Sequence, residues 1–280
     1  LILAPLGAAL AQGAGRPSIL RRWDFVVRDS VGSYPSWLEV TPSGRDIYVG
    51  RWQGRVGSAR PISRITWIDG VMHFAIPPQW EDGNADLQVQ ARLEQDRLVG
   101  TIVNPGGSSH SFTATRAPTL NRSGPPVWGR PDTLFNGRDL TGWTTQGEPG
   151  APNNWTVRNG VLVNTASGAN LMTTRHFTDF RLHVEFRYPP RGNSGVYLRG
   201  RYEVQVEDNA ERDMPLPVHI GGVYGMLWPN ENASTAPNQW QTYDITLVGR
   251  RLTVVLNGKT VMPDEIIPGP TGGAHDSHAG

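Results

Sequence analysis

Short runs of alternating apolar and polar residues recur along nearly the whole chain, and turn residues separate them. In "RITWIDGVMHFAIP" (64–77), Asp69-Gly70 divides two such runs and predicts a tight hairpin. Because strand side chains point alternately to the two faces of a sheet, this alternation predicts strands with one buried face. No stretch has the continuous periodicity of a helical bundle. The chain is therefore expected to be all-β, which its 33 glycines and 23 prolines favour.

The first block of predicted strands covers residues 18–117. Its alternating runs include "WDFVV" (23–27), "SWLEV" (36–40), "DLQVQARLEQDRLVGTIV" (86–103) and "HSFTATRAP" (110–118). Evenly spaced antiparallel strands predict a small β-barrel or sandwich domain, and no catalytic constellation is visible in it. Residues 118–132, with four prolines and little periodicity, are expected to form a linker.

The second block, residues 133–280, predicts another antiparallel domain. Hairpin turns are expected at Asn159-Gly160, Gly249-Arg250 and Asn257-Gly258. Three strands around the last two turns favour a sandwich of two antiparallel sheets. The chain stops at "GGAHDSHAG" (272–280), so this domain is expected to lack its closing strand.

The N-terminus and the charge balance bear on location and partners. Residues 1–11 are apolar and end in Ala9-x-Ala11, which is typical of a signal-peptide remnant and predicts a secreted or periplasmic protein. No other segment could span a membrane. A net charge of +1 gives no indication of nucleic acid, and the absence of cysteine excludes disulfides and thiolate chemistry. The oligomeric state is left open.

The run "RGNSGVYLRGRYEVQVEDN" (191–209) has a polar row that is unusual for a solvent face. From Tyr197 onward, one face combines a ring, guanidinium groups, carboxylates and an amide: Tyr197, Arg199, Arg201, Glu203, Gln205 and Glu207. Such a row suits a sugar, since a ring can stack on it, amides and guanidinium groups can bond its hydroxyls, and a glutamate can move protons. An exposed cross-strand salt-bridge ladder would use the same residue types. Gly200 could place a bulge or turn within the run.

Two irregular segments add aromatic and titratable side chains to this picture. "PVHIGGVYGMLWPNENA" (217–233) carries His219, Tyr224 and Trp228, and "APNQW" (236–240) ends in Trp240. Loops on a rigid sheet often carry binding groups.

Six segments together resemble the 3-keto-disaccharide hydrolase family, over about residues 131–280. They are "LFNGRDLTGW" (134–143), "NWTVRNGVL" (154–162), "RGNSGVYLRGRYEVQVEDN" (191–209), "GGVYG" (221–225), "QWQTYDITLVGRRLTVVLNG" (239–258) and "GPTGGA" (269–274). The resemblance implies a concanavalin-like jelly roll of two antiparallel sheets with substrate on the concave face. It also implies cleavage of glycosides oxidised to a ketone at C3, by removal of the C2 proton, elimination of the C1 substituent and hydration.

The resemblance also implies roles for particular residues of this chain. Glu203 would be the acid/base, Arg199 or Arg201 would polarise the ketone or hold hydroxyls, and His219 would be a second acid/base or a metal ligand. Gln205 and Asp208 would orient the sugar or a metal ion, and Asn193 would also bind substrate, in a cleft lined by Tyr197, Tyr224 and Trp240. No cofactor is assigned, although a divalent cation could stabilise an enediolate. His275, Asp276 and His278 could bind such an ion.

Two other interpretations stay open. "EVQVE" (203–207) is similar to the Glu-x-Asp-x-Glu signature of laminarinase-like glycosidases, but Gln205 replaces the central carboxylate and weakens a double-displacement mechanism. A carbohydrate-binding module without catalysis would use the same fold. Replacement of Glu203 by Gln should abolish turnover in an enzyme and leave sugar binding intact in either case.

Overall fold

The structure is a computed structural model that describes residues 19–44, 47–81, 83–120, 122, 124–147, 150–209 and 215–274. Every regular element within these ranges is a strand, so the all-β prediction is confirmed. The chain divides into two compact units, the first drawn mostly from residues up to 116 and the second from residue 117 onward. The predicted signal-peptide remnant at 1–11 lies outside the described residues.

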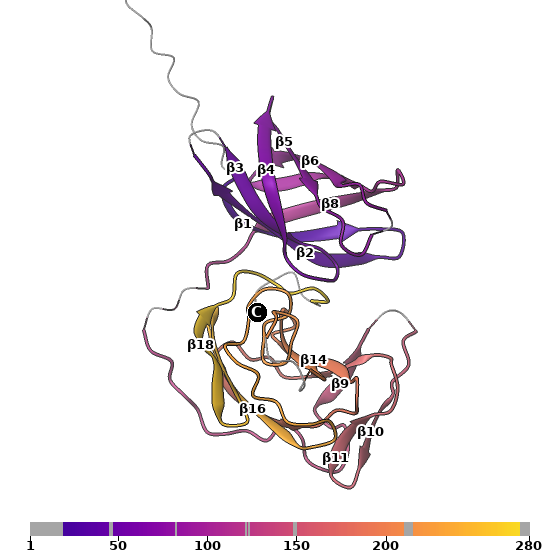
Figure 1. Cartoon of the computed structure of the whole chain (residues 1–280), viewed down its shortest axis with the longest axis vertical. Helices are drawn as coiled ribbons and strands as arrows, with labels where there is room; N and C mark the ends of the chain where they lie inside the picture. The colour runs from indigo at the N-terminus through magenta and orange to yellow at the C-terminus, as the bar shows by residue number, and fades with distance from the viewer. Residues whose placement is uncertain are drawn as a thin grey trace, which may run out of the picture. The chain divides into compact units, whose positions relative to one another are not determined.

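The first unit is a closed antiparallel barrel, in which each strand pairs with its neighbour in sequence and β1 pairs with β8 (Figure 1). Of the two architectures that the sequence allowed, barrel or sandwich, the structure has the barrel. Its strands are β1 (Arg21–Arg28), β2 (Ser33–Pro42), β3 (Tyr48–Gln53), β4 (Arg60–Ile68), β5 (Val71–Ile76), β6 (Leu87–Glu94), β7 (Arg97–Val103) and β8 (Ser109–Arg116).

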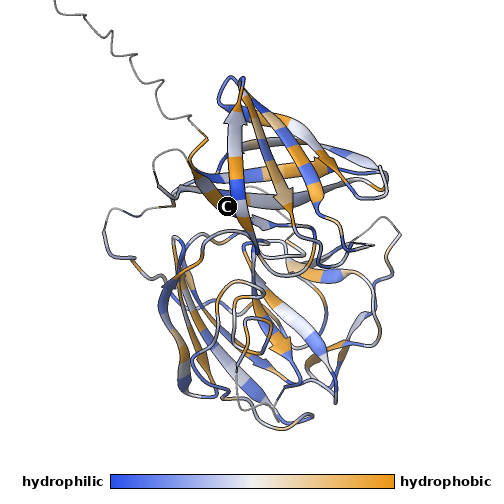
Figure 2. Ribbon diagram, turned by 45° about the horizontal axis from the view of Figure 1, so that its top comes forward, coloured by the Kyte–Doolittle hydropathy of each residue, from blue (hydrophilic) through white to orange (hydrophobic). Residues whose placement is uncertain are grey.

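Aromatic side chains fill the barrel. The strands alternate between hydrophobic and hydrophilic residues (Figure 2), and Phe25 lies at the centre of an aromatic cluster. Its ring centroid is 4.9 Å from that of Trp52 and 4.7 Å from that of Phe112. An eight-stranded barrel is just wide enough for side chains to occupy its interior. The interior of this unit is therefore its hydrophobic core.

The second unit combines one four-stranded antiparallel sheet, in the order β13-β16-β17-β18, with the two-stranded pairs β10-β11, β9-β12 and β14-β15. Its strands are β9 (Trp143–Gln146), β10 (Trp155–Arg158), β11 (Val161–Asn164), β12 (Asn170–Thr173), β13 (Phe180–Phe186), β14 (Asn193–Leu198), β15 (Tyr202–Glu207), β16 (Gln241–Val248), β17 (Arg251–Leu256) and β18 (Lys259–Ile266). The antiparallel character predicted for this unit is confirmed.

Two-residue turns set the register of the hairpins. The turns predicted at Asp69-Gly70, Asn159-Gly160 and Asn257-Gly258 are all present, and every one of these residues has a positive φ, between 50° and 81°. Positive φ at both central positions is the geometry of the turn that matches the twist of the flanking strands. The local residue pair therefore determines where each strand reverses.

Tyr243 on β16 ties the four-stranded sheet to β15. Its side chain is fully buried, and its hydroxyl donates to the carbonyl of Gln205 at 2.5 Å while accepting from the N–H of Gly221 at 2.7 Å. The core around it is built from alternate residues of β15, β16 and β17, with Val204, Ile245 and Val254 almost completely buried. The hairpin β14-β15 is thereby held on the apolar face of this sheet. The part of the chain that the structure describes has no helix that could cross a membrane.

Candidate active site

The polar run at 191–209 is a hairpin. Arg199 and Gly200 form its turn, with φ of 55° and 65°, and the N–H of Arg201 donates to the carbonyl of Leu198 at 3.1 Å. The turn expected near Gly200 is present and divides the polar row, so Arg199 and Arg201 lie at the turn where the chain reverses. The remaining row lies across two strands, where three pairs face each other: Tyr197 with Glu203, Gly195 with Gln205, and Asn193 with Glu207.

Glu203 lies at the centre of this row and is only 9% exposed. The hydroxyl of Tyr197 contacts its Oε2 at 2.7 Å. Its backbone is held from both sides, since its N–H donates to Thr271 Oγ1 at 3.1 Å and its carbonyl accepts from the N–H of Tyr224 at 3.0 Å. The residue to which the sequence assigned the acid/base role is therefore buried and fixed in position.

Burial raises the pKa of Glu203 to about 7, although the hydrogen bond from Tyr197 acts in the opposite direction. A carboxyl group with this pKa is about half ionised at neutral pH. The ionised form can accept a proton and the neutral form can return one, which is the property required of a general acid/base.

The hydroxyl of Tyr197 lies between two acceptors. It is 2.7 Å from Glu203 Oε2 and 3.0 Å from the carbonyl oxygen of Gly272, but a phenol has one proton to donate. When Glu203 is protonated, it can donate to the phenol oxygen, and the phenol can then donate to Gly272. Burial and the nearby carboxyl raise the pKa of Tyr197 well above its usual range, so the phenol keeps its proton. The protonation of Glu203 is therefore coupled to the hydrogen bonding of the 271–273 segment.

Two glycines make room for this pair. A Cβ at Gly195 would lie 2.0 Å from Glu203 Oε1 and 2.5 Å from its Cγ, and a Cβ at Gly273, where φ is 74°, would lie 2.6 Å from the hydroxyl of Tyr197. Thr271 completes the arrangement, because its N–H donates to the carbonyl of Arg201 at 2.9 Å. These three residues were missed as site residues, although they lie in "GNSG" and "GPTGG", which carry part of the family resemblance.

Arg199 anchors the hairpin turn. Its guanidinium donates to the carbonyls of Thr178 at 2.7 Å and Gly249 at 2.8 Å, and it lies 3.5 Å from the carboxylate of Asp179. Arg201 is 2% exposed, and its guanidinium lies 5.8 Å from the centre of the Tyr202 ring. These contacts of the two arginines stabilise the turn of the hairpin, and the role predicted for either at a ketone stays a prediction.

Three further predicted residues lie along the same hairpin. Gln205 is buried, and its Oε1 accepts from the N–H of Val206 at 3.1 Å. Asp208 accepts from the N–H of Arg191 at 2.6 Å and so closes the entry to β14, where Asn193 is exposed. Gln205 and Asn193 share the Glu203 row, and Asp208 stabilises the end of the hairpin. Their contacts with substrate remain predictions.

The segment after residue 217 borders β15 on the side away from β14, through a bridge between Val204 and Val223. It places Tyr224 beside Glu203, since the N–H of Tyr224 donates to the carbonyl of Glu203 at 3.0 Å. Burial and the charge of Glu203 raise the pKa of Tyr224. His219 is buried, and its Nδ1 accepts from the N–H of Leu216 at 3.0 Å, which leaves Nε2 to carry the proton of the neutral ring.

Trp240 is 49% exposed, with the guanidinium of Arg187 lying 5.1 Å from its ring centre. The catalytic role of His219 and the cleft-lining role of Trp240 remain predictions. Within the described ranges, no three His, Asp or Glu side chains are grouped so that they could hold a metal ion. The candidate ligands His275, Asp276 and His278 lie outside the described residues.

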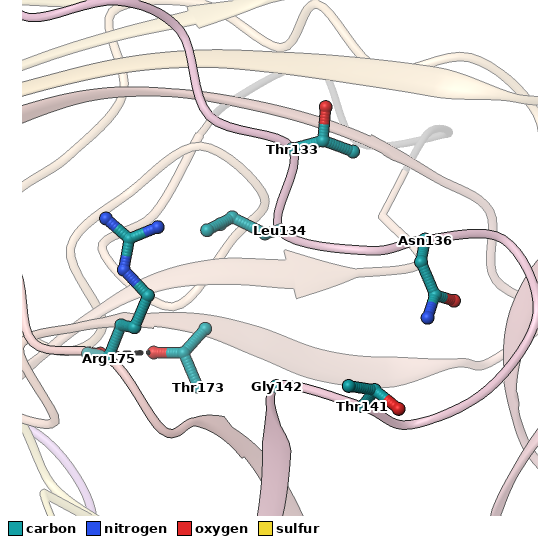
Figure 3. Close-up of a pocket in the computed structure, with 7 residues that line it drawn as sticks. All are labelled: Thr133, Leu134, Asn136, Thr141, Gly142, Thr173 and Arg175. Carbon is teal, nitrogen blue, oxygen red and sulfur yellow. Dashed lines mark hydrogen bonds between the residues drawn. The ribbon is translucent and has the colours of Figure 1, made fainter.

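Figure 3 shows a pocket in the second unit. It is lined by Thr133, Leu134, Asn136, Thr141, Gly142, Thr173 and Arg175, none of which is a predicted site residue. Asn136 Nδ2 donates to Asp139 Oδ1 at 2.8 Å, and the indole N–H of Trp143 donates to the carbonyl of Leu134 at 2.9 Å. The "LFNGRDLTGW" motif therefore forms a loop that is stabilised by hydrogen bonds between its own residues.

Comparisons with known proteins show which family the second unit is similar to. A family model of the 3-keto-alpha-glucoside-1,2-lyase-like domain matches residues 130–279. A 3-keto-disaccharide hydrolase from Bacteroides thetaiotaomicron is 27% identical over 109 residues, which are 36% of this chain and 37% of that protein. The match thus spans well under half of that relative.

Two solved structures of candidate glycosyl hydrolases from Parabacteroides distasonis ATCC 8503 are also similar. One has a TM-score of 0.43 and 30% identity and covers 49% of this chain and 66% of that one. The other has a TM-score of 0.40 and 21% identity and covers 46% and 69%. Because the family model matches more than half of the chain, the chain belongs to the family of the 3-keto-alpha-glucoside-1,2-lyase-like domain.

Proposed function

We propose that the second unit cleaves glycosides that already carry a ketone at C3, and that Glu203 moves the proton on which the reaction depends. The observation that carries the proposal is a buried carboxyl with a pKa of about 7, bonded to the hydroxyl of Tyr197 on the polar face of a hairpin. Family membership and the name of the Bacteroides relative support a carbohydrate substrate.

The proposed reaction needs one group that both takes and returns a proton. A C3 ketone acidifies the C2–H bond, and ionised Glu203 removes that proton to leave an enolate. The enolate expels the C1 substituent, whose oxygen takes up a proton. Water then adds across the C1–C2 double bond of the enone, so that the net result is hydrolysis. A base whose pKa lies near the working pH is best suited to such a step.

The same unit is proposed to be a concanavalin-like jelly roll, with the β14-β15 row facing the substrate. Its antiparallel strands and the position of β15 on the apolar side of the four-stranded sheet support this architecture. The apolar segment at 1–11 supports a secreted or periplasmic location, where glycans are available as substrates.

The laminarinase-like signature has an ionisable Asp between its two glutamates. In this chain Gln205 lies between Glu203 and Glu207, with its Oε1 bonded to the N–H of Val206. An amide cannot ionise or share a proton, so this position favours the chemistry with one proton-moving group.

The test is to incubate the protein with a chromogenic 3-keto-glucoside and, separately, with the unoxidised glucoside, with and without EDTA. Release of the aglycone from the keto form alone supports the proposal, and inhibition by EDTA would add a metal ion to it. Cleavage of the unoxidised glucoside would move the assignment to a laminarinase-like mechanism. Binding of sugar without cleavage of either substrate would identify a binding module.

A further inference from the structure

The loop that joins β5 and β6 of the barrel exposes an indole ring. Trp80 is 68% exposed, whereas Trp23, Trp37 and Trp52 of the same unit are between 0 and 2% exposed. A single exposed apolar side chain is common on protein surfaces. What distinguishes Trp80 is the way its backbone is held.

Glu81 ties the loop to a buried arginine. Its Oε2 accepts from the N–H groups of Gln79 at 2.8 Å and Trp80 at 3.1 Å. Arg60 is 6% exposed, and its Nη1 donates to both carboxylate oxygens of Glu81 at 2.9 and 3.0 Å and to the carbonyl of Pro77 at 2.9 Å. The backbone on both sides of the indole is thereby fixed to the first residue of β4.

The hydrogen bonds of the Glu81 carboxylate persist at physiological pH. Burial acts to raise the pKa of Glu81, but the hydrogen bonds from Gln79 and Arg60 outweigh it and hold the pKa below its usual value. The carboxylate therefore stays ionised and bonded. A side chain presented on a preorganised loop loses less conformational entropy when a ligand binds.

The composition of the loop that carries Trp80 indicates the chemistry of its ligand. Exposed Gln79, Asn84 and Asp86 supply amide and carboxylate groups, and the loop 77–86 contains no lysine or arginine. This composition suits a neutral, hydroxyl-rich ligand and disfavours a phosphate. The size of the indole points the same way, since a tryptophan buries about 150–250 Å², whereas a stable protein interface buries about 800 Å² on each partner.

We propose that this loop is a carbohydrate site, separate from Glu203, in which Trp80 stacks on one pyranose ring while the amide and carboxylate groups of the loop bond its hydroxyls. The site would hold the enzyme on a glycan through the barrel. It needs no ketone on the sugar, so it does not depend on the reaction proposed for Glu203.

The test uses the whole chain labelled with ¹⁵N, titrated with maltohexaose, cellohexaose or laminarihexaose at millimolar concentrations. We expect one of the ten tryptophan indole signals to shift most. It should be the signal that is absent from the spectrum of Trp80→Ala, and this variant should bind the oligosaccharide at least tenfold more weakly. If none of the three sugars shifts that signal, or if Trp80→Ala binds normally, the proposal is wrong.

Two further variants test the role of the loop. Ile68→Ala removes another exposed apolar side chain of the barrel, 56% exposed, and should bind as the wild type does. Glu81→Ala keeps the indole but releases the loop, so it should bind several-fold more weakly while the barrel stays folded by circular dichroism. Wild-type affinity in Glu81→Ala would refute the preorganised site. Because the sugars are unoxidised, a negative result here leaves the keto-glucoside assay unaffected.

Discussion

At the scale of single residues, the site depends on a carboxyl group whose charged form is destabilised because the group is buried. Glu203 lies in the unit's interior, and its partner Tyr197 can bond either to the carboxylate or to Gly272. Loss of a proton from Glu203 therefore changes both the charge in the site and the hydrogen bonds around it. Two predictions follow from this arrangement, one about stability and one about the pKa itself.

Glu203→Gln should abolish turnover of a 3-keto-glucoside and stabilise the protein at high pH. The folded pKa of Glu203, about 7, lies above that of the unfolded chain, so burial favours the neutral form. This contribution to stability is fully present below about pH 4 and is lost as the pH rises through 7. The loss is on the order of 3 kcal/mol, and a neutral glutamine avoids it. Thermal unfolding should show a gain at pH 8 and none at pH 4; equal gains at both would contradict the raised pKa.

Tyr197→Phe should raise the pKa of Glu203 further. The phenol stabilises the carboxylate by donating to it, and hydrogen bonds to charged groups contribute about 1.5–3 kcal/mol. We expect an upward shift of about one pH unit or more, measured by ¹³C NMR of the labelled carboxyl and by the acidic limb of the pH–rate profile. Tyr224→Phe is the matched control and should shift the pKa much less. An unchanged pKa in Tyr197→Phe would rule out the coupling.

At the scale of elements, the β14-β15 hairpin brings the row together by its register. The turn at Arg199-Gly200 places Tyr197 opposite Glu203, and Gly195 leaves the space that the Glu203 side chain occupies. A shift of one residue in this pairing would send every side chain of the row to the other face. The arrangement of the site therefore requires Gly195 as well as Glu203.

Gly195→Ala should reduce kcat on a 3-keto-glucoside at least tenfold and lower the melting temperature. The new Cβ would overlap the buried Glu203 side chain as far in as its Cγ, so the carboxyl must leave the position that it occupies. In the background of Glu203→Gln, the same alanine should cause no further loss, because both changes remove the same function. Additive losses in this double-mutant cycle would show that Gly195 acts elsewhere.

At the scale of the whole molecule, each unit has a hydrophobic core of its own. The barrel encloses Phe25 and Trp52, while the second unit packs Val204, Tyr243 and Val254. The proposed reaction belongs to the second unit, and the proposed Trp80 site belongs to the barrel. Changes in one core are therefore expected to act mainly on the unit that contains it.

Gly100→Ala should destabilise the barrel and leave the chemistry intact. The added Cβ would lie 2.0 Å from the carbonyl of Gln90 and 2.8 Å from the Cα of Ala91, and the backbone cannot give way as a flexible side chain does. Overpacking of this kind costs about 1–3 kcal/mol. Calorimetry should show a lower melting temperature for the barrel, with turnover of a soluble keto-glucoside at 25 °C within twofold of wild type. A large loss of turnover would show that the barrel takes part in the reaction.

Much of this fold could be predicted from local sequence. Alternation gave the strands and their buried faces, and residue pairs such as Asn159-Gly160 and Asn257-Gly258 marked the turns, because a positive φ at both central positions favours few residues. The glutamate of the row and the tyrosine opposite it were also named. The turn at Gly200, which the sequence allowed, divides the row and leaves the two arginines at the point where the chain reverses.

What the sequence by itself determined is therefore the order of the strands, their turns and the polar residues of the run 191–209, all of which depend on residues close together in the chain. The tertiary structure alone decided which of these side chains are buried and what they contact. Thr271 and Gly272 reach the Glu203–Tyr197 pair from 68 and 75 residues away in sequence. The pKa of Glu203 depends on how completely such distant segments exclude water from it, and the residues next to Glu203 in sequence do not predict that exclusion.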